Sequence, residues 1–472
     1  MKKSILLALV VLVSVPMAFP SIVTNTNQSI GFYRLLARYA SLDTDAVYYN
    51  PAGLTKLSDG FHLALNNQTI NQNKTIINGL PLLNGYDADL GGAEYVGKVR
   101  VPFFPTFYAV YKKGPLAVSF GFNPIGGGGS ADYASGLPSF EAGYAKLPTL
   151  IYSATGGMIA VNGYSADISF NGSSIYYGFQ LNISYAINDM FSVAGGLRYV
   201  SASNTYEGSL SNVMVSPYFP AFGWDGVTMI KASTVFTALG QTAYAAATGD
   251  LSVDAAQKGS GFTPVLSFMA TPIEGLVLTI RYEFNTKLEL TNSTTTDDTK
   301  GILSADGMFP DGAKTRADIP ATLAFGASYA ILPQLRVHAS LNTDFDKQAN
   351  WNGREAYIDK NTLEWALGVE YDVLENVTVS AGYLNSSYGV KDEFQSDMDF
   401  TLSASTIGAG AKWRLSDSLS VEAGLISVNY KDYDKLITYY WDALETLPIG
   451  AFKETYKQTT FGFGFAVNYS FR

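Results

Sequence analysis

The sequence predicts an all-β fold: a 14-stranded antiparallel transmembrane β-barrel with a small N-terminal helical hatch, or plug, in its lumen. Three observations support this prediction. Apolar and polar residues alternate in many runs, short turns alternate with long connections, and the chain begins with an export signal. A composition of 45 Gly, 31 Tyr and 28 Phe among 472 residues, with 15% charged residues, suits strands with a small-residue lumen face and aromatic girdles.

The N-terminal residues 1–20 have the pattern of a secretory signal peptide. Met1, Lys2 and Lys3 precede an apolar stretch from Ile5 to about Ala18, which is too short to span a bilayer with margin. No later segment is apolar over the length of a helical span. We therefore expect cleavage at roughly 18 to 21 and an exported chain in a bacterial outer membrane.

Fourteen segments show the period of two that is typical of β-strands, whose side chains point alternately to two faces. They lie at about residues 61–72, 103–112, 115–123, 174–186, 191–206, 262–270, 275–290, 319–330, 335–345, 361–372, 377–388, 402–415, 419–431 and 459–471. In the last segment the large apolar side chains would face lipid, while small residues such as Gly462 and Gly464 would face the lumen. Phe471, one place before the C-terminal Arg472, ends this strand.

The connections between these strands alternate without exception between short and long. Six tight turns lie at residues 112–115, 187–190, 271–275, 331–334, 373–376 and 416–418. The long connections lie at residues 73–102, 124–173, 207–261, 291–318, 346–360, 389–401 and 432–458. Short periplasmic turns, long outer loops and an even strand number are typical of outer-membrane barrels, whereas a soluble all-β protein has no reason to gather its long loops at one end.

Residues 21–58 do not alternate in this way, and we expect them to form the hatch inside a barrel of residues 59–472. Asn50 suits the N-cap of a helix and Pro51 its first position, where the missing N–H costs nothing. A free amphipathic arm is the alternative. A plug is favoured because a fourteen-stranded barrel encloses more space than its own small lumen side chains fill.

The segment from Ala37 to Leu57 resembles the N-terminal hatch of the FadL family of outer-membrane long-chain fatty acid and hydrocarbon transporters. The residues of this hatch motif are Asp45, Ala46, Val47, Tyr48, Tyr49, Asn50, Pro51, Ala52 and Gly53. The resemblance implies that a hydrophobic ligand (a fatty acid, a hydrocarbon or a detergent) passes from the outer loops to a pocket against the hatch. It also implies a lateral exit into the outer-membrane lipid.

Gly121, Asn123 and Pro124, in and after the third strand, occupy the place where members of that family have a kinked strand that opens the wall. Gly121 and Asn123 would face the lumen, and Pro124 cannot donate a hydrogen bond to a neighbouring strand. The resemblance therefore implies an opening in the wall beside these residues.

Applying the alternation to each strand places a set of charged or titratable side chains in the lumen. They are His62, Arg198, Arg281, Glu283, Arg336, His338, Asp344, Glu364, Glu370, Lys412, Arg414 and Glu422. We expect most of them to pair with each other or with the hatch, because an unpaired charge away from water is costly. Arg281, Arg336 and Arg414 are the candidates for binding a substrate carboxylate, since a guanidinium offers that group a bidentate fork.

No catalytic residue, metal site or cofactor is predicted, and we expect no enzyme activity. His338, with Ser340 and Asn342 on the same face, would point into the lumen rather than at a lipid substrate. The absence of Cys excludes a thiolate metal site, and a net charge of −10 argues against nucleic acid as a partner. The sequence thus favours a monomeric barrel for passive transport of hydrophobic compounds. A general porin for small hydrophilic solutes and a surface adhesin or structural barrel are the alternatives.

Overall fold

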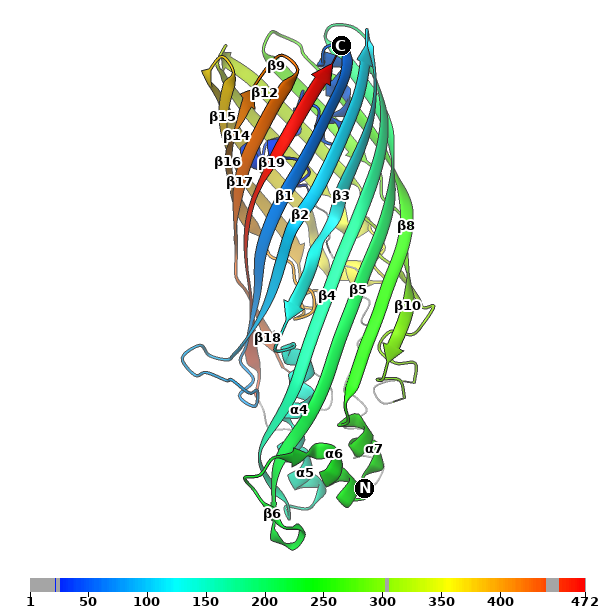
Figure 1. Cartoon of the computed structure of the whole chain (residues 1–472), viewed down its shortest axis with the longest axis vertical. Coiled ribbons are helices and arrows are strands. Elements are labelled where there is room, and N and C mark those ends of the chain that lie inside the picture. Colours follow the sequence, from blue (N-terminus) through cyan, green and yellow to red (C-terminus); the bar gives the residue numbers. More distant parts are fainter. Residues whose placement is uncertain (1–21, 23–25, 302–304, 439–449, 472) are drawn as a thin grey trace.

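The computed structural model describes residues 22, 26–301, 305–438 and 450–471. It confirms the predicted fold: one antiparallel sheet closes into a barrel, because β1 pairs with both β2 and β19 (Figure 1). β6 and β7 are two-residue strands in an outer loop, and β10, β11 and β18 each continue a neighbouring strand after a break, so the wall has fourteen strands. The predicted signal peptide, residues 1–20, lies outside the described residues.

The strands follow one another around the wall in chain order. Their bounds are β1 Gly60–Asn78, β2 Ala93–Lys113, β3 Leu116–Tyr133, β4 Ala160–Ala186, β5 Phe191–Phe219, β6 Trp224–Asp225, β7 Ile230–Lys231, β8 Leu251–Ala270, β9 Leu276–Glu283, β10 Glu289–Asp297, β11 Lys314–Arg316, β12 Thr322–Leu332, β13 Leu335–Asp344, β14 Ile358–Leu374, β15 Val377–Val390, β16 Ala404–Arg414, β17 Leu419–Tyr430, β18 Tyr433–Ile437 and β19 Phe452–Phe471.

Several strands extend far beyond their predicted outer ends. β4 and β5 remain paired from the turn at residues 187–190 out to Ala160 and Tyr218, so they project beyond the rest of the wall (Figure 1). The expectation of loops at residues 124–173 and 207–261 is therefore wrong for much of both segments. The alternation does not mark these ends because a strand outside the membrane has no lipid that requires one face to be apolar.

Four helices surround the projecting ends of β4 and β5 and form, together with them, the outer extension (Figure 1). The helices are α4 Pro138–Ala145, α5 Leu147–Ala154, α6 Ala232–Ala238 and α7 Thr242–Ala247. Short 3₁₀ helices lie in the outer loops at η2 Pro220–Phe222, η3 Asp346–Gln348 and η4 Arg354–Tyr357. The outer extension has its own apolar core, in which Leu147, Ile151 and Val235 are buried.

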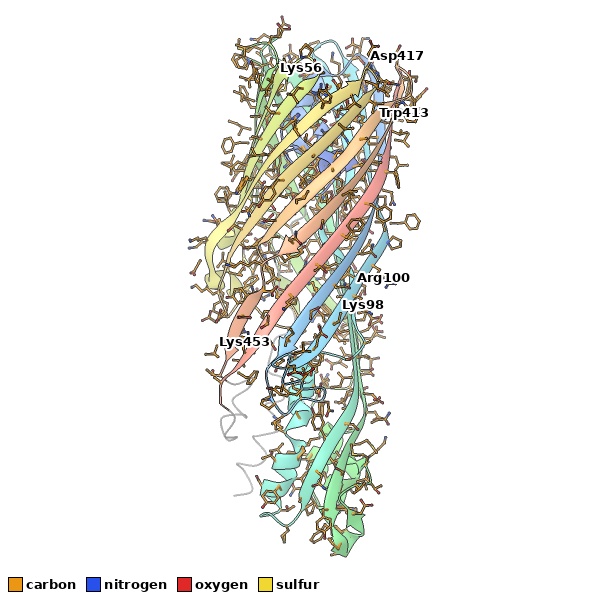
Figure 2. The ribbon with its side chains drawn as sticks, turned by 90° about the vertical axis from the view of Figure 1, so that its left-hand side faces the viewer. Lys56, Lys98, Arg100, Trp413, Asp417 and Lys453 are labelled. Atoms are coloured by element: carbon orange, nitrogen blue, oxygen red, sulfur yellow. The ribbon has the colours of Figure 1, made fainter. Side chains whose placement is uncertain are left out.

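The outer face of the barrel carries large apolar side chains, as the alternation predicts (Figure 2). On β19, Phe461, Phe463 and Phe465 are exposed, while the intervening Gly462 and Gly464 are buried in the lumen. Figure 2 shows the two ends of the barrel, with Lys56, Trp413 and Asp417 near the short turns and Lys98, Arg100 and Lys453 towards the long loops. No helix in the described part of the chain is long and apolar enough to cross a membrane.

Residues 26–57 lie inside the barrel, close to the short turns. They form α2 Ile30–Leu35, α3 Ala46–Tyr49 and the 3₁₀ helix η1 Pro51–Lys56. α2 packs against β14 to β17 and β19, whereas η1 packs against β4, β5 and β8 on the other side of the lumen. At the end of this segment, the Lys56 ammonium donates to the carbonyl oxygen of Asp189 in a short turn.

Candidate functional site

A buried ion pair holds the inner segment together. The guanidinium of Arg38 donates to both carboxylate oxygens of Asp45, from Nε at 2.8 Å and from Nη2 at 2.9 Å. The hydroxyls of Ser29 and Ser41 donate to the same carboxylate, each at 2.6 Å. Because this carboxylate is buried and has four donors, the segment is a packed plug rather than a free arm, and we refer to residues 26–57 as the hatch.

Other residues of the motif join the hatch to the wall. The carbonyl oxygen of Val47 accepts hydrogen bonds from Gln180 and Asn182, at 2.9 and 3.1 Å. The ring of Tyr48 lies between two arginines, with Arg281 Cζ at 4.6 Å and Arg198 Cζ at 5.1 Å from its centroid. These contacts lie on the lumen faces of β4, β5 and β9, so the motif fixes the hatch to this side of the barrel.

Asn50 is the N-cap residue of η1, as predicted, but the expected capping by its side chain is wrong. No hydrogen bond from its side chain caps η1; instead its Nδ2 donates to the carbonyl oxygen of Ser41 at 3.0 Å, and its Oδ1 accepts from Ser267 Oγ at 3.3 Å. Pro51 does occupy the start of the helix, as predicted. Gly53 is required because a Cβ there would overlap the Asn50 amide and lie 2.8 Å from the Ser41 carbonyl oxygen. The amide is thus occupied in closing the loop before the helix.

On the opposite side, α2 lies directly on glycines of the wall. Cross-strand pairs link glycines of β14, β15, β16, β17 and β19, and we call this set the glycine belt. Its members are Gly368, Gly382, Gly408, Gly410, Gly424 and Gly464. A Cβ on any of them would meet atoms of the hatch or of a neighbouring strand at less than ordinary contact distance. The belt therefore gives the backbone of the hatch room against the wall.

Most of the lumen charges pair with each other or with the hatch, as expected. Arg34 in α2 is fully buried and forms ion pairs with Glu422 at 2.6 Å and Glu370 at 3.1 Å. Lys412 pairs with Asp43 of the hatch at 2.8 Å. These pairs anchor the hatch to the same strands that carry the glycine belt.

Each of the three arginines predicted to bind a carboxylate has a partner, and Arg281 lies apart from the other two. Arg281 is buried against Tyr48 and pairs with Glu283. Arg336 forms two hydrogen bonds with Asp372, at 2.7 and 2.9 Å, and Arg414 donates to the carbonyl oxygen of Glu375. Arg336 and Arg414 line a polar cavity of about 490 Å³ between the hatch and the short turns. Carboxylate binding by these three residues stays a prediction.

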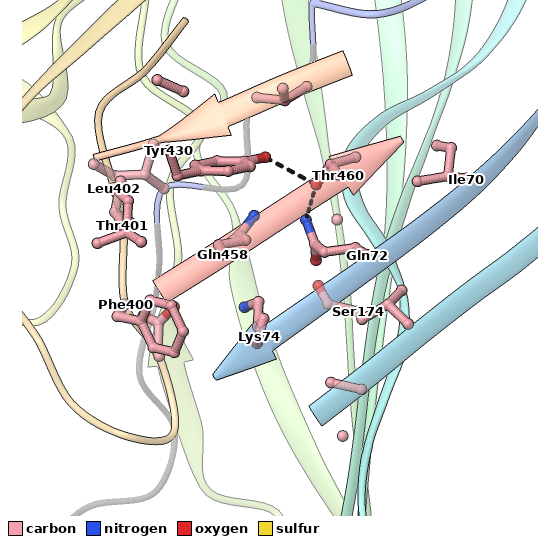
Figure 3. Close-up of a pocket in the computed structure, with 18 of the residues that line it drawn as sticks. Ile70, Gln72, Lys74, Ser174, Phe400, Thr401, Leu402, Tyr430, Gln458 and Thr460 are labelled. Atoms are coloured by element: carbon pink, nitrogen blue, oxygen red, sulfur yellow. Dashed lines mark hydrogen bonds between the residues drawn. The ribbon is translucent and has the colours of Figure 1, made fainter. Parts of the chain in front are cut away.

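A second cavity, of about 450 Å³, lies on the outer side of the hatch (Figure 3). Phe32 and Asn27 of the hatch lie at its base, and its walls carry aromatic side chains, among them Tyr133, Tyr176 and Phe400. Gln72 donates to Thr460 at 3.0 Å, and Tyr430 is 3.2 Å from the same hydroxyl, so these polar groups of the wall satisfy one another (Figure 3). The cavity can hold a largely apolar molecule with one polar end.

Lys74 supplies the cavity with a cation that our strand prediction missed. Its Nζ lies 5.1 Å from the centroid of the Phe400 ring, and no carboxylate of the described chain lies within 4 Å of it. Asp399 also lines the cavity but pairs with Arg354 at 3.0 Å. The predicted first strand ended at residue 72; continuing its alternation by two residues would have placed Lys74 on the lumen face.

The barrel wall is interrupted between β2 and β3. Pairing runs from Lys113 to Phe107 of β2 and resumes only at Val99, so residues 100–106 have no partner among residues 123–130 in the described pairing. Both edges contain prolines, namely Pro102, Pro105 and Pro124, which cannot donate to a ladder. β3 remains paired with β4 and β2 with β1, so the interruption is confined to one junction.

The interruption adjoins the cavity, and the predicted opening residues lie beside it. Val99 and Phe104 on one edge and Gly127 and Ala131 on the other line the cavity. Asn123 and Pro124 belong to the unpaired stretch, whereas Gly121 is still paired with Tyr108, just before it.

The hatch reaches the unpaired stretch through Gln28. The Nε2 of Gln28 donates to the Pro124 carbonyl oxygen at 3.0 Å. Its own carbonyl oxygen accepts from the Tyr108 hydroxyl at 2.7 Å, and Asn123 donates to that hydroxyl at 2.6 Å. One end of the interruption is therefore tied directly to the hatch.

In the described residues, no group of His, Asp and Glu side chains is placed to hold a metal ion. His338 lies on the lumen face, where its Nε2 is 3.2 Å from Glu370 Oε2 in the anchor of α2. The side chain thus belongs to the ion-pair cluster below the hatch rather than to a lipid-facing site.

A family model described as "Outer membrane protein transport protein (OMPP1/FadL/TodX)" matches residues 171–471. No curated protein sequence matches the chain.

Solved structures share the fold at low sequence identity. A Pseudomonas aeruginosa FadL homologue is 13% identical, with 96% of this chain and 100% of that chain covered and a TM-score of 0.63. The P. putida toluene transporter TodX is 13% identical, covering 91% and 94% of the two chains with a TM-score of 0.57. The Ralstonia pickettii toluene transporter TbuX is 14% identical, with the same coverage and a TM-score of 0.51.

Proposed function

We propose that this chain, which belongs to the OMPP1/FadL/TodX family of outer membrane transport proteins, takes up hydrophobic compounds passively, its substrates being long-chain fatty acids or aromatic hydrocarbons. The cavity on the outer side of the hatch carries this proposal. It combines aromatic walls, a closed base and a single lysine without an ion-pair partner in the described chain. These features suit an apolar body with one acidic end, because an ammonium in apolar surroundings gains most from an anionic ligand.

The route has three steps. The ligand enters from the outer extension, binds with its carboxylate at Lys74, and leaves between β2 and β3 into the membrane. Support for the exit comes from residues 100–106 and 123–130, which are unpaired with one another and adjoin the cavity on both edges. A straight path to the periplasm is disfavoured because the hatch is anchored to the wall by buried ion pairs.

The general porin is the weaker alternative, because the hatch fills the lumen with buried side chains such as Tyr33 and Tyr49. We further propose that the chain acts as a monomer in the outer membrane after removal of residues 1–20, with a hatch of residues 21–58 and a barrel of residues 59–472. Transport, rather than catalysis, is the activity that the family and the cavity support.

Uptake assays test this function directly. Cells that lack the protein should lose uptake of a long-chain fatty acid or of toluene, while uptake of a small sugar stays unchanged. Equal flux of sugar and fatty acid through the wild type would favour the porin.

Binding by purified variants tests the role of Lys74. Lys74→Met should weaken fatty acid binding roughly 10- to 100-fold, the loss expected for one charge-assisted hydrogen bond, and should leave toluene binding unchanged. Lys74→Arg should retain most of the affinity. Lys98→Met is the matched control, because Lys98 lies on the neighbouring strand but faces outwards. Equal affinities of Lys74→Met and wild type for the fatty acid would show that Lys74 does not bind its carboxylate.

A further inference from the structure

The β2 edge of the wall interruption contains a β-bulge. In the pairing of β1 with β2, the single residue Thr69 faces two residues, Pro102 and Phe103. An extra residue of this kind bends its strand and leaves backbone groups without a partner in the ladder. Within the hydrocarbon region such groups cannot turn to water, so they need another partner.

Two side chains on the lipid-facing side of β1 provide that partner. Thr69 Oγ1 donates to the carbonyl oxygen of Pro102 at 3.0 Å, and Asn67 Nδ2 donates to the same oxygen at 3.4 Å. Asn67 Oδ1 accepts from the backbone N–H of Phe104 at 3.2 Å. Together the two side chains bond the backbone on both sides of the bulge.

Asn67 and Thr69 lie where the outward-facing row of β1 changes from apolar to polar, because Asn71 and Asn73 follow them. The outward-facing residues that precede them on β1 include Phe61 and Leu65, and their neighbours on β19 are Phe465 and Phe463. A polar side chain facing lipid is unfavourable unless its hydrogen bonds are satisfied. The bulge satisfies the hydrogen bonds of Asn67 and Thr69.

The bulge also determines what lies at the mouth of the interruption. Phe103 is 77% exposed on the outer face, and it lies within residues 100–106 of β2, which do not pair with β3. We propose that Asn67 and Thr69 are positioning residues for the lateral exit: they hold the bulge in β2 and thereby keep the mouth of the interruption in one defined conformation. This inference rests on the proposed exit of ligand between these two strands.

Matched variants separate the hydrogen bonds from the side-chain volume. Thr69→Val removes the hydroxyl at nearly constant shape, whereas Thr69→Ser keeps it. Asn67→Leu removes both hydrogen bonds of the amide. Asn71→Leu is the control, because Asn71 is next in the same outward row and has no side-chain hydrogen bond within the described chain.

Two measurements on the full-length protein in detergent or liposomes test the proposal. Deuterium exchange of the backbone amides of residues 100–106 should rise roughly fivefold or more in Thr69→Val and Asn67→Leu, and stay at the wild-type level in Thr69→Ser and Asn71→Leu. Transfer of a fluorescent fatty acid from the loaded protein to the surrounding bilayer should slow several-fold in the first two variants only. Binding affinity should be the same in all four.

The outcomes distinguish this inference from the proposed function. Unchanged exchange in Asn67→Leu and Thr69→Val would show that these side chains do not hold the bulge. Faster exchange with normal transfer would overturn their positioning role. If transfer also persists when β2 and β3 are cross-linked across the interruption, the lateral exit itself is wrong, whatever holds the bulge.

Discussion

The carbonyl oxygen of Leu35 lies so close to the α-carbon of Gly382 that a Cβ on this glycine would overlap it. Leu35 ends α2, and Gly382 lies at the middle of the glycine belt, paired with Gly368 on one side and Gly408 on the other. Ion pairs of Arg34 reach the wall beside this contact. The position of the hatch thus depends on glycines, which leave room for its backbone, as much as on charged side chains.

Gly382→Ala should displace the hatch from the wall. The added methyl group cannot be accommodated without moving the backbone of α2, a change that overpacking makes unfavourable by about 1–3 kcal/mol. Ion conductance in planar bilayers should rise above the wild-type level while the barrel remains assembled. Gly195→Ala is the control, since nothing lies within 4 Å of a Cβ at that position. Equal conductance of the two variants would contradict the role given to the belt.

Asp45→Asn should loosen the hatch from within. The substitution leaves the Arg38 guanidinium buried without its main carboxylate, and breaking a buried pair in this way costs about 3–5 kcal/mol. Proteolysis of the hatch and bilayer conductance should both increase. Asp43→Asn should do much less, because the Asp43 side chain is 39% exposed and exposed pairs contribute about 1 kcal/mol or less. A hatch that is equally resistant in both variants would rule out this account of the motif.

A reversible cross-link should close the exit. Thr106 and Asn123 follow the last regular pair, Phe107 with Phe122, and the chain has no Cys of its own, so Thr106→Cys with Asn123→Cys can form one disulfide. Oxidation should stop fatty acid transfer to the membrane, and reduction should restore it. Ala109→Cys with Phe120→Cys, in the paired part of the same strands, is the control.

The cross-link is a sharper test than a bulky residue at Gly121. A Cβ at Gly121 would already lie 2.9 Å from Val47 Cγ1, so such a substitution would disturb the hatch as well as the exit. Fatty acid transfer that continues after the disulfide has formed would rule out the lateral route between β2 and β3.

The outer extension should be more stable at high pH than at neutral pH, because Lys146 is buried. It joins α4 to α5, is 1% exposed and its ammonium has no hydrogen-bond partner in the described residues. Burial lowers the pKa of Lys146 from 10.5 to about 8. Because the unfolded extension then binds more protons between these values, stability is greatest above about pH 10.5 and falls as the pH drops to about 8.

Lys146→Met should therefore protect the outer extension from limited proteolysis at pH 7, by on the order of 3 kcal/mol. The protection should shrink as the pH approaches 10. Lys231→Met, which removes a half-exposed lysine of the same extension, should show neither effect. A constant advantage at every pH would mean that packing, rather than charge, explains the result.

The sequence by itself determined the barrel and the existence of a hatch. Lipid requires one apolar face on every membrane-spanning strand, so the alternation in residues such as Phe461, Phe463 and Phe465 is a local signal that needs no knowledge of the neighbours. The hatch is likewise compact, and its buried ion pair, Arg38 with Asp45, joins residues only seven positions apart.

Tertiary structure alone decided the outer ends of the strands and the roles of individual polar side chains. β4 and β5 extend beyond the membrane because they pair with each other. Backbone pairing outside lipid does not require one apolar face, so the sequence of these ends shows no alternation that would predict a strand. Asn50 bonds Ser41 and Ser267 rather than capping its helix, since those partners come within reach only after the hatch docks in the barrel.

The same reason explains which cation is available to a ligand. Arg34 meets Glu422, 388 residues away, and Arg336 meets Asp372 on the next strand, while Lys74 alone of these three has no carboxylate within ion-pair distance in the described structure. An inward-facing charge can be recognised from its place in an alternating strand. Whether that charge is already neutralised depends on side chains that only the closed barrel brings beside it.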